Sequence, residues 1–344
     1  MTVEHKPLLE VRNLKKYFPI QQGILRRTRG FVKAVDDVSF TIGAGETLGL
    51  VGESGCGKTT TGRCIARVYQ PTAGDILFHG DEGIIPVNRL EKQALKVFRK
   101  NMQMIFQDPY ASLNPRMTVL ELVGEPLLAH GLAKGRELED RVAEMLLAVG
   151  LKLEHLRRYP HSFSGGQRQR IGIARALVQR PKLVICDEPV SALDVSIQSQ
   201  IVNLLQDLQD HYKLTYLFVA HDMSVVRHIS NRVAVMYVGR VVELAATEEL
   251  MTAPKHPYTE ALLSAVPRPN PTHQRQRIIL GGEAADPSKT VPGCVFHPRC
   301  RYAKDICKTE EPPLNEVTPN HYVACHLATE LTLEGIAPTL PTGD

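Results

Sequence analysis

Tryptophan, long apolar runs and a dominant charge are all missing from this sequence of 344 residues. Its longest apolar stretches, at residues 183–186 and 233–238, are far shorter than the roughly 18 residues that a membrane-spanning helix needs. With 41 basic and 37 acidic side chains the net charge is +4, too small an excess to indicate nucleic-acid binding. The sequence therefore predicts neither a membrane span nor a nucleic-acid partner.

The pattern of a secretory signal is also lacking. The first ten residues are mostly polar, without a basic start, an apolar segment and a small-residue cleavage site. We therefore expect a cytoplasmic location, where any role at a membrane comes through partner proteins. The apolar share of 43% allows a sizeable core, and the length indicates one large domain or two modest ones.

The most informative feature that is present is a glycine-rich segment after a short apolar run. Residues 52–59 read Gly-Glu-Ser-Gly-Cys-Gly-Lys-Thr, which is the phosphate-loop pattern G-x-x-x-x-G-K-[ST]. Glycines let backbone N–H groups curl around phosphate oxygens, Lys58 adds a positive charge, and the Thr59 hydroxyl can bind Mg²⁺. A glycine-rich turn that binds nothing is the alternative. The pattern predicts ATP and Mg²⁺ binding by Gly52, Ser54, Gly55, Cys56, Gly57, Lys58, Thr59 and Thr60.

Two acidic residues directly follow the apolar run at residues 183–186. There a carboxylate can reach a Mg²⁺ ion beside the phosphate loop. We expect Asp187 to orient the metal and Glu188 to be the base that positions the attacking water. Taken alone, the same two acids could equally cap a helix. A second possible phosphate-binding surface lies at Ser164, Gly165, Gly166 and Gln167, which open an expected helix and leave backbone donors exposed.

Strands that alternate with helices predict a mostly parallel sheet with both faces covered. The strands are expected at residues 8–14, 35–42, 47–51, 75–78, 183–186 and 215–219. The helices are expected at residues 60–69, 90–99, 136–149, 168–177, 198–214 and 223–229. Thirteen of the 23 prolines lie from residue 254 onward. We therefore divide the chain into a nucleotide-binding domain at residues 1–253 and an irregular extension at residues 254–344.

The order and spacing of these motifs resemble those of the ABC-transporter ATPases over residues 8–250. The resemblance rests on the phosphate loop, residues 163–167, the Asp187-Glu188 pair, residues 191–194 and His221. It implies an α/β fold: a P-loop ATPase with a RecA-like core, an antiparallel β subdomain and a helical subdomain at about residues 110–165. It also implies that two cassettes pair head to tail, with each ATP between one phosphate loop and the other cassette's Ser-Gly-Gly-Gln segment.

The resemblance also assigns roles to single residues. Gln107 resembles the lid-loop glutamine that senses Mg²⁺ or water and couples to the membrane subunit. His221 resembles the switch histidine on the γ-phosphate, and Asp194 would complete a loop that contacts the paired cassette. An aromatic side chain near the start should stack on adenine, and we choose Phe18 over Tyr17 from its position relative to the preceding strand.

The last ninety residues narrow the resemblance further. The C-terminal extension of oligopeptide and dipeptide importer ATPases is resembled by residues 256–263, 267–269 and 293–300. Nearer the start of the chain, the second ATPase subunit of dipeptide permeases is resembled by residues 14–19 and 52–58. This implies ATP-driven import of di- or oligopeptides at the cytoplasmic face of the inner membrane. The implied partners are a second ATPase, two permeases docking near residues 107–125, and an extracytoplasmic peptide-binding protein. An importer of nickel or another small solute, or a soluble ABC ATPase, remains an alternative.

Four of the seven cysteines lie close together in the extension. In a reducing compartment, such clustering indicates a metal rather than disulfides. Four thiolates can hold either a [4Fe–4S] cluster or Zn²⁺. The likeness to peptide-permease ATPases favours a [4Fe–4S] cluster, structural or redox-sensing, over Zn²⁺ or no metal. The expected ligands are Cys294, Cys300, Cys307 and Cys325.

Overall fold

The chain folds as two compact units, each built from several separate segments. The computed structural model describes residues 7–22, 27–81, 83–108, 112–266, 277–282, 286–289 and 291–336. The first unit comprises residues 1–9, 41–47 and 77–219, and the second comprises residues 10–40, 48–76 and 220–344. Residues 267–269 of the predicted extension motif and residues 109–111 of the predicted docking region lie outside the described residues.

A parallel three-stranded arrangement lies at the centre of the first unit. Its strands run in the order β6 (Met102–Ile105), β7 (Leu183–Asp187) and β8 (Thr215–Val219). Every residue of β7 and β8 is buried, as expected for parallel strands that are covered on both faces. A short antiparallel pair joins β5 (Gly83–Pro86) to the end of β4 (Ala73–Gly80).

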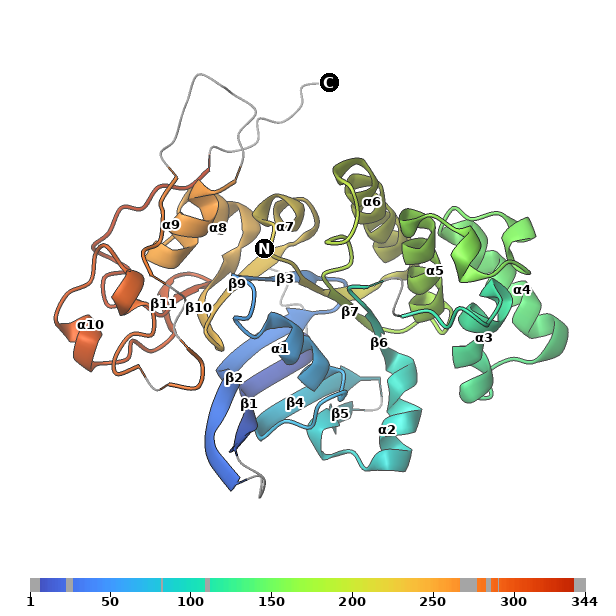
Figure 1. Cartoon of the computed structure of the whole chain (residues 1–344), viewed down its shortest axis with the longest axis horizontal. Helices are drawn as coiled ribbons and strands as arrows, with labels where there is room; N and C mark the ends of the chain where they lie inside the picture. Colours follow the sequence, from blue (N-terminus) through green and yellow to red (C-terminus); the bar gives the residue numbers. More distant parts are fainter. Residues whose placement is uncertain are drawn as a thin grey trace. The chain divides into compact units, whose positions relative to one another are not determined.

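The described residues of the first unit also form helices. They are α2 (Lys92–Phe98), α3 (Val119–Ala129), α4 (Gly135–Ala148), α5 (Gly165–Leu177) and α6 (Val195–Tyr212). Helices α3, α4 and α5 pack on one another and form one group, drawn in green in Figure 1. The apolar residues Leu138, Val142, Met145 and Leu146 of α4 recur at helical spacing and are buried.

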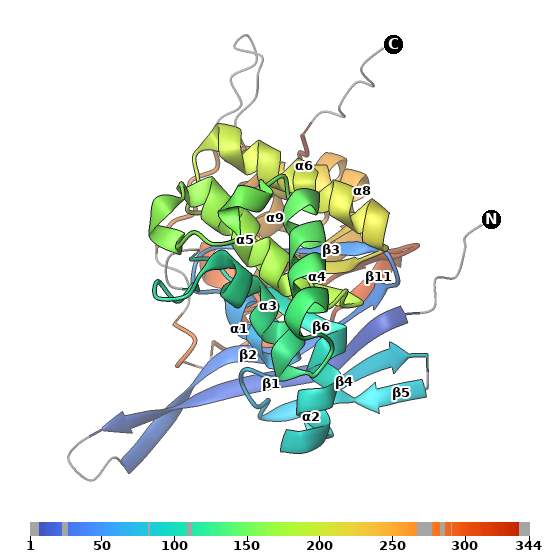
Figure 2. The ribbon, with the colours of Figure 1, turned by 90° about the vertical axis from the view of Figure 1, so that its right-hand side faces the viewer.

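The second unit contains the long strands β1 (Pro7–Gln22) and β2 (Arg27–Gly43), whose first or last few residues belong to the first unit. β1 lies between β2 and β4, and Figure 2 shows β1 and β2 extending side by side. A second set of strands starts with β3 (Thr47–Val51), which is parallel to β9 (Arg232–Tyr237).

The strand set of the second unit continues into the C-terminal part of the chain. β10 (Arg240–Ala246) is antiparallel to β9, β12 (His321–Val323) is antiparallel to β10, and β11 (Asn315–Thr318) is antiparallel to β12. The helices of this unit are α1 (Lys58–Ile65), α7 (Met223–Ile229), α8 (Thr247–Thr252), α9 (Pro257–Ser264) and α10 (Ile306–Thr309). The described part of the extension is therefore attached to the same sheet that carries β3.

Short 3₁₀ helices connect several of these elements. They are η1 (Val87–Arg89), η2 (Arg99–Asn101), η3 (Leu153–His155), η4 (Pro160–Ser162) and η5 (His297–Arg299). Across the residues that the structure describes, no helix combines the length and the apolar character that a bilayer span requires.

Candidate functional site

The phosphate loop lies in the second unit, between β3 and α1. Gly52, Gly55 and Gly57 have φ angles of 152°, 81° and 107°, which side chains other than glycine's rarely tolerate. A Cβ atom on Gly52 would lie 2.1 Å from the carbonyl oxygen of Met236, and one on Gly57 would lie 2.1 Å from that of Ala34. The loop is therefore a bare backbone cradle packed against two neighbouring strands, as phosphate binding requires.

Lys58 lies at the start of α1 with its ammonium directed into this loop. The side chain is buried, and Nζ donates to the carbonyl oxygens of Gly52 at 2.8 Å and Glu53 at 2.9 Å. No side chain caps the helix, whose N-cap residue is Gly57. The N–H groups of the first turn and the ammonium thus make the loop attractive to an anion.

The other predicted residues of the loop differ in their exposure. Ser54 is exposed, whereas Thr59 and Thr60 are half-buried. Cys56 is buried, and burial raises the pKa of its thiol, which keeps the thiol neutral. Its Sγ lies 3.8 Å from Nζ of Lys58.

The two aromatic candidates for adenine stacking are neighbours on β1. The ring of Phe18 lies edge-on to Tyr69 at a centroid distance of 5.5 Å, with Nζ of Lys16 at 4.8 Å from its centroid. The hydroxyl of Tyr17 donates to Asp36, and burial together with this hydrogen bond raises the pKa of Tyr17 to about 12. The Tyr17 side chain is thus held by its hydrogen bond to Asp36. The stacking of Phe18 on adenine stays a prediction.

His221 is an exposed residue of the second unit, and it immediately precedes Asp222, the N-cap of α7. The preceding residue, Ala220, donates its N–H to the carbonyl oxygen of Leu50 in β3 at 3.1 Å. Since the phosphate loop starts two residues after Leu50, His221 and this loop leave the sheet from the same edge.

The first unit brings together two of the predicted catalytic residues. Gln107 follows β6 and Glu188 follows β7, and the amide Nε2 of Gln107 donates to Oε2 of Glu188 at 3.0 Å. Glu188 has a φ of 47°, which is uncommon for a residue other than glycine and is typical of functional positions. The backbone N–H of Glu188 also donates to Val219 at 3.0 Å, and Asp187 is buried at the end of β7.

The Ser-Gly-Gly-Gln segment forms a capping box at the start of α5. The N–H of Gln167 donates to Oγ of Ser164 at 3.3 Å, and the N–H of Ser164 donates to Oε1 of Gln167 at 3.1 Å. The N–H groups of Gly165 and Gly166 belong to the first turn and are not used by this box. A Cβ atom on Gly166 would lie 2.7 Å from Cγ2 of Ile197 in α6, so a larger residue there would force Ile197 to shift.

Asp194 is the N-cap of α6. Its Oδ1 accepts hydrogen bonds from the N–H of Ile197 and the hydroxyl of Ser196, both at 3.0 Å, and these bonds lower the pKa of Asp194. Asp194 therefore caps α6 within this chain. Its contact with a paired cassette stays a prediction.

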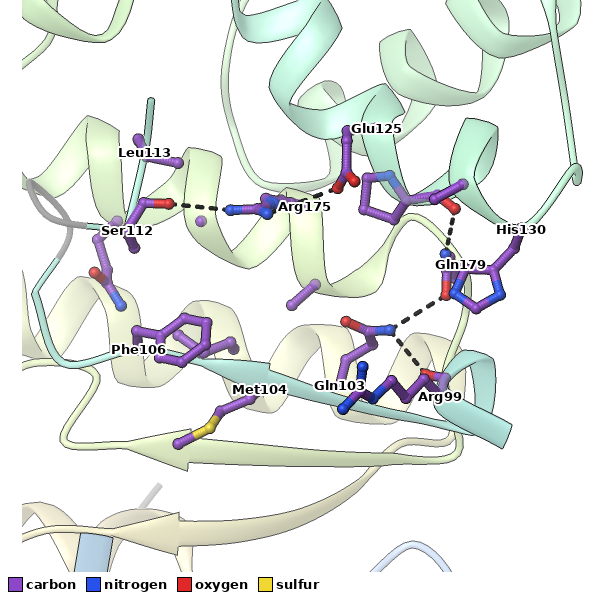
Figure 3. Close-up of a pocket in the computed structure, with 16 residues that line it drawn as sticks. Arg99, Gln103, Met104, Phe106, Ser112, Leu113, Glu125, His130, Arg175 and Gln179 are labelled. Carbon is purple, nitrogen blue, oxygen red and sulfur yellow. Dashed lines mark hydrogen bonds and ion pairs between the residues drawn. The ribbon is translucent and has the colours of Figure 1, made fainter. Parts of the chain in front are cut away.

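The first unit also contains a pocket of about 320 Å³ beside Phe106 (Figure 3). It lies among β6, α3 and α5. On one wall, Arg175 donates to the carbonyl oxygen of Ser112 at 3.0 Å and lies 3.6 Å from the carboxylate of Glu125. On another wall, Gln103 donates to Oε1 of Gln179 at 3.2 Å. Phe106 is 42% exposed, and this exposed aromatic ring immediately precedes Gln107.

The predicted metal cluster in the extension is wrong. Among the described residues, no group of three or more His, Cys, Asp and Glu side chains is placed so that it could hold a metal ion. Neither a [4Fe–4S] cluster nor Zn²⁺ is therefore supported at Cys294, Cys300, Cys307 and Cys325.

The physical reason for this correction is geometric, because among the described residues no three of these side chains converge on a position that an ion could occupy. Without a metal, burial raises the pKa of Cys294, that of Cys300 to about 11 and that of Cys325 to about 12, so these thiols are neutral. Cys325 instead accepts a hydrogen bond from the N–H of Leu327 at 3.4 Å. The spacing of the cysteines could not show this burial.

Comparisons with known proteins agree with this geometry. The family model described as ABC transporter matches residues 35–191, and the model of the C-terminal region of oligopeptide/dipeptide transporters matches residues 242–307. The chain is 55% identical over 323 residues to the oligopeptide transport ATP-binding protein AppF of Bacillus subtilis, covering 93% of this chain and 97% of AppF. It is 47% identical to the dipeptide transport ATP-binding protein DppF of Haemophilus influenzae, covering 94% and 97%.

Solved structures support the same fold. The dimeric structure of the bacterial ABC transporter cassette MJ0796 matches with a TM-score of 0.61 and 29% identity, covering 70% of this chain and 98% of that one. The chain of cbiO1 from Clostridium perfringens, part of the ABC transporter complex cbiONQ, matches with a TM-score of 0.60 and 27% identity, covering 71% and 90%.

The chain therefore belongs to the ABC-transporter ATPase family, whose members couple ATP hydrolysis to transport. The predicted fold class, a P-loop ATPase of α/β type, is confirmed. Within the family it groups with the ATP-binding proteins of oligopeptide and dipeptide transporters, as the sequence resemblance predicted.

Sequence reasoning missed a group of residues around Glu53. This residue of the phosphate loop is bound by Tyr258 and Arg299, more than 200 residues away in the chain. Glu53 occupies a variable position of the motif, so no pattern singled it out. A pairing over such a sequence distance has no local signal.

Proposed function

We propose that this protein is the ATP-hydrolysing subunit of an importer for di- or oligopeptides. The observation that carries the proposal is the combination of a phosphate loop in backbone-cradle geometry with the C-terminal region typical of oligopeptide/dipeptide transporters. The 55% identity to an oligopeptide transport ATP-binding protein extends over nearly the whole of both chains. We accordingly assign residues 1–253 to the ATPase cassette, its helical subdomain to about residues 110–165, and residues 254–344 to the peptide-importer extension.

In this proposal the phosphate loop and Lys58 bind the triphosphate. The hydroxyl of Thr59, the amide oxygen of Gln107 and the carboxylate of Asp187 are hard oxygen donors, the kind that Mg²⁺ prefers. The ion neutralises charge on the terminal phosphates when it is bound. Glu188 orients the attacking water, and its hydrogen bond with Gln107 fixes its carboxylate. His221 contacts the γ-phosphate, and Phe18 stacks on adenine.

The proposed unit contains partner chains. A second ATPase subunit contributes its Ser-Gly-Gly-Gln segment to the ATP of this chain and receives the exposed capping box of α5 in return. The pocket beside Phe106 takes a short helix of a membrane permease, since it offers an exposed aromatic ring next to Gln107. Two permeases and an extracytoplasmic peptide-binding protein complete the importer at the cytoplasmic face of the membrane.

A membrane pull-down with this chain as bait tests the proposal. We expect two polytopic permeases and a second ATPase to co-purify with the wild-type chain. Phe106→Ala should reduce the captured permeases at least five-fold, because it removes the exposed ring of the pocket. Leu147→Ala is the matched control, since Leu147 is an exposed apolar residue of α4 outside the lining of the pocket.

Two outcomes would count against the proposal. Capture of no membrane protein by the wild-type chain would favour an ABC ATPase that works without a membrane partner. If the captured permeases support uptake of nickel or another small solute but of no peptide, the chain would instead belong to a small-solute importer of the same subfamily.

A further inference from the structure

Glu53, the second residue of the phosphate loop, is held by two side chains from the C-terminal part of the chain. Its backbone N–H donates to the hydroxyl oxygen of Tyr258 in α9 at 2.8 Å. Its carboxylate receives both ends of the Arg299 guanidinium, from Nη1 to Oε2 at 2.8 Å and from Nη2 to Oε1 at 3.2 Å. All of these residues belong to the second unit. Such a two-point fork is the strongest form of the arginine–carboxylate pair.

The pair is partly removed from water. The side chain of Arg299 is 9% exposed and that of Glu53 is 32% exposed. The guanidinium lies 6.0 Å from the ring of Tyr237, which packs against Tyr258 and Phe296 at centroid distances of 4.7 and 5.2 Å. The hydrogen bond with Glu53 raises the pKa of Arg299, so that its charge is permanent. The Glu53–Arg299 pair is therefore less screened by water than an ion pair on the solvated surface.

Each polar group of Glu53 has a distinct partner. The N–H donates to Tyr258, and the carboxylate accepts from Arg299. The carbonyl oxygen accepts from Nζ of Lys58 at 2.9 Å and from the N–H of Cys56 at 3.3 Å. The extension thus contacts the residue that also positions the lysine of the phosphate loop. The carboxylate places a negative charge in a loop that must receive an anionic triphosphate, and such a charge is repulsive unless it is neutralised.

We propose that Arg299 is a positioning residue of the ATP site, which neutralises Glu53 and makes MgATP affinity depend on the docking of the extension. The proposal rests on the proposed assignment of the phosphate loop as the ATP site. Tyr258 fixes the backbone of Glu53, and Arg299 fixes its side chain and charge. Loss of either contact removes one of the two links between Glu53 and the extension, but only loss of Arg299 leaves its carboxylate without the neutralising charge.

MgATP binding to the purified full-length chain, measured by isothermal titration calorimetry at low and high salt, tests this inference. Arg299→Ala should weaken binding about five- to ten-fold at low salt, and less at high salt because salt screens the unpaired carboxylate. The double variant Glu53→Gln with Arg299→Ala should bind within about two-fold of the wild type, since the repelling charge is gone. Adenosine, which carries no phosphate, should bind wild type and Arg299→Ala equally.

The controls separate this role from a structural one. Arg301→Ala removes a nearby arginine that pairs with Glu260 instead, and it should leave MgATP affinity unchanged. Thermal unfolding of each variant shows whether it is folded, and Arg299→Lys, which keeps the charge but loses the fork, should give an intermediate affinity. An affinity of Arg299→Ala within two-fold of wild type, or a double variant as weak as Arg299→Ala, would overturn the inference.

The assignment of the ATP site is tested separately in the same titration. Lys58→Ala should abolish measurable MgATP binding. If Lys58→Ala binds as the wild type does, the proposed ATP site fails. If it loses binding while Arg299→Ala does not, only the role of Arg299 fails.

Discussion

Glu188 shows how a single residue combines strain with function. Its φ of 47° is held by its N–H bond to Val219 and by the position of β7, and it presents its carboxylate to the amide of Gln107. A residue in this backbone region costs about 1–3 kcal/mol, which the surrounding strands must offset. The sequence predicted both residues from motifs, but it could not show the strain.

At the same scale, His321 is predicted to make stability depend on pH. Burial alone would lower the pKa of His321, but hydrogen bonds to Glu243 at 2.7 Å and Glu249 at 2.8 Å outweigh burial and raise it. Glu243 also accepts from the N–H groups of Lys255 and His256, and Glu249 from the Thr318 hydroxyl. Burial lowers the pKa of the His256 imidazole to about 3, so this ring is neutral.

The sign of the effect follows from the raised pKa of His321. The charged imidazole stabilises the fold fully below the unfolded pKa of about 6.5, and this contribution is lost as pH rises through the folded value. His321→Gln should therefore cost about 3 kcal/mol at pH 5.5 and less at pH 9. Thermal unfolding of both proteins across this range measures the difference, and a difference that stays constant with pH would contradict the prediction.

At the scale of elements, two helices of the chain offer a matched comparison. α5 and α3 both start with capping boxes, Ser164 with Gln167 and Thr118 with Glu121. Ser164→Ala and Thr118→Ala should each lower the free energy of unfolding by about 1 kcal/mol, because each removes a cap. Only Ser164→Ala should also lower ATP hydrolysis by the assembled transporter, at least ten-fold, since its segment faces the ATP of the paired subunit in our proposal. Equal losses of hydrolysis in both variants would contradict this assignment.

The elements also show what the sequence could predict. β3, β8 and α7 were predicted at their observed bounds, because each is a short apolar or amphipathic segment between clear turn residues. α1 ends earlier than predicted, since Arg67 has a φ of 53° and breaks the helix. α3 was missed because Gly124 and Pro126 lie inside it, and both are poor helix formers.

Contacts between distant segments could not be predicted from local patterns. β12 was missed because it is three residues long and becomes a strand only by pairing with β10. The same limit applies to the candidate site. The phosphate loop was found from its motif, whereas its contacts with Tyr258 and Arg299 depend on a fold that brings the extension to the loop.

At the scale of the whole molecule, our proposal is that this chain supplies ATP hydrolysis to peptide uptake. A substitution that blocks hydrolysis but leaves ATP binding intact separates this claim from a merely structural role. Glu188→Gln is this substitution, because it keeps the hydrogen-bonding shape of the side chain and removes the charge that orients water. Glu139→Gln, on the exposed face of α4, is the matched control.

The most direct measurement is ATP-driven uptake of a labelled di- or oligopeptide by proteoliposomes that contain the complete transporter. We expect uptake with the wild-type chain and with Glu139→Gln. With Glu188→Gln we expect uptake and hydrolysis to fall at least a hundred-fold, with MgATP still bound. Uptake by the Glu188→Gln transporter at the wild-type rate would contradict the proposed function of this chain.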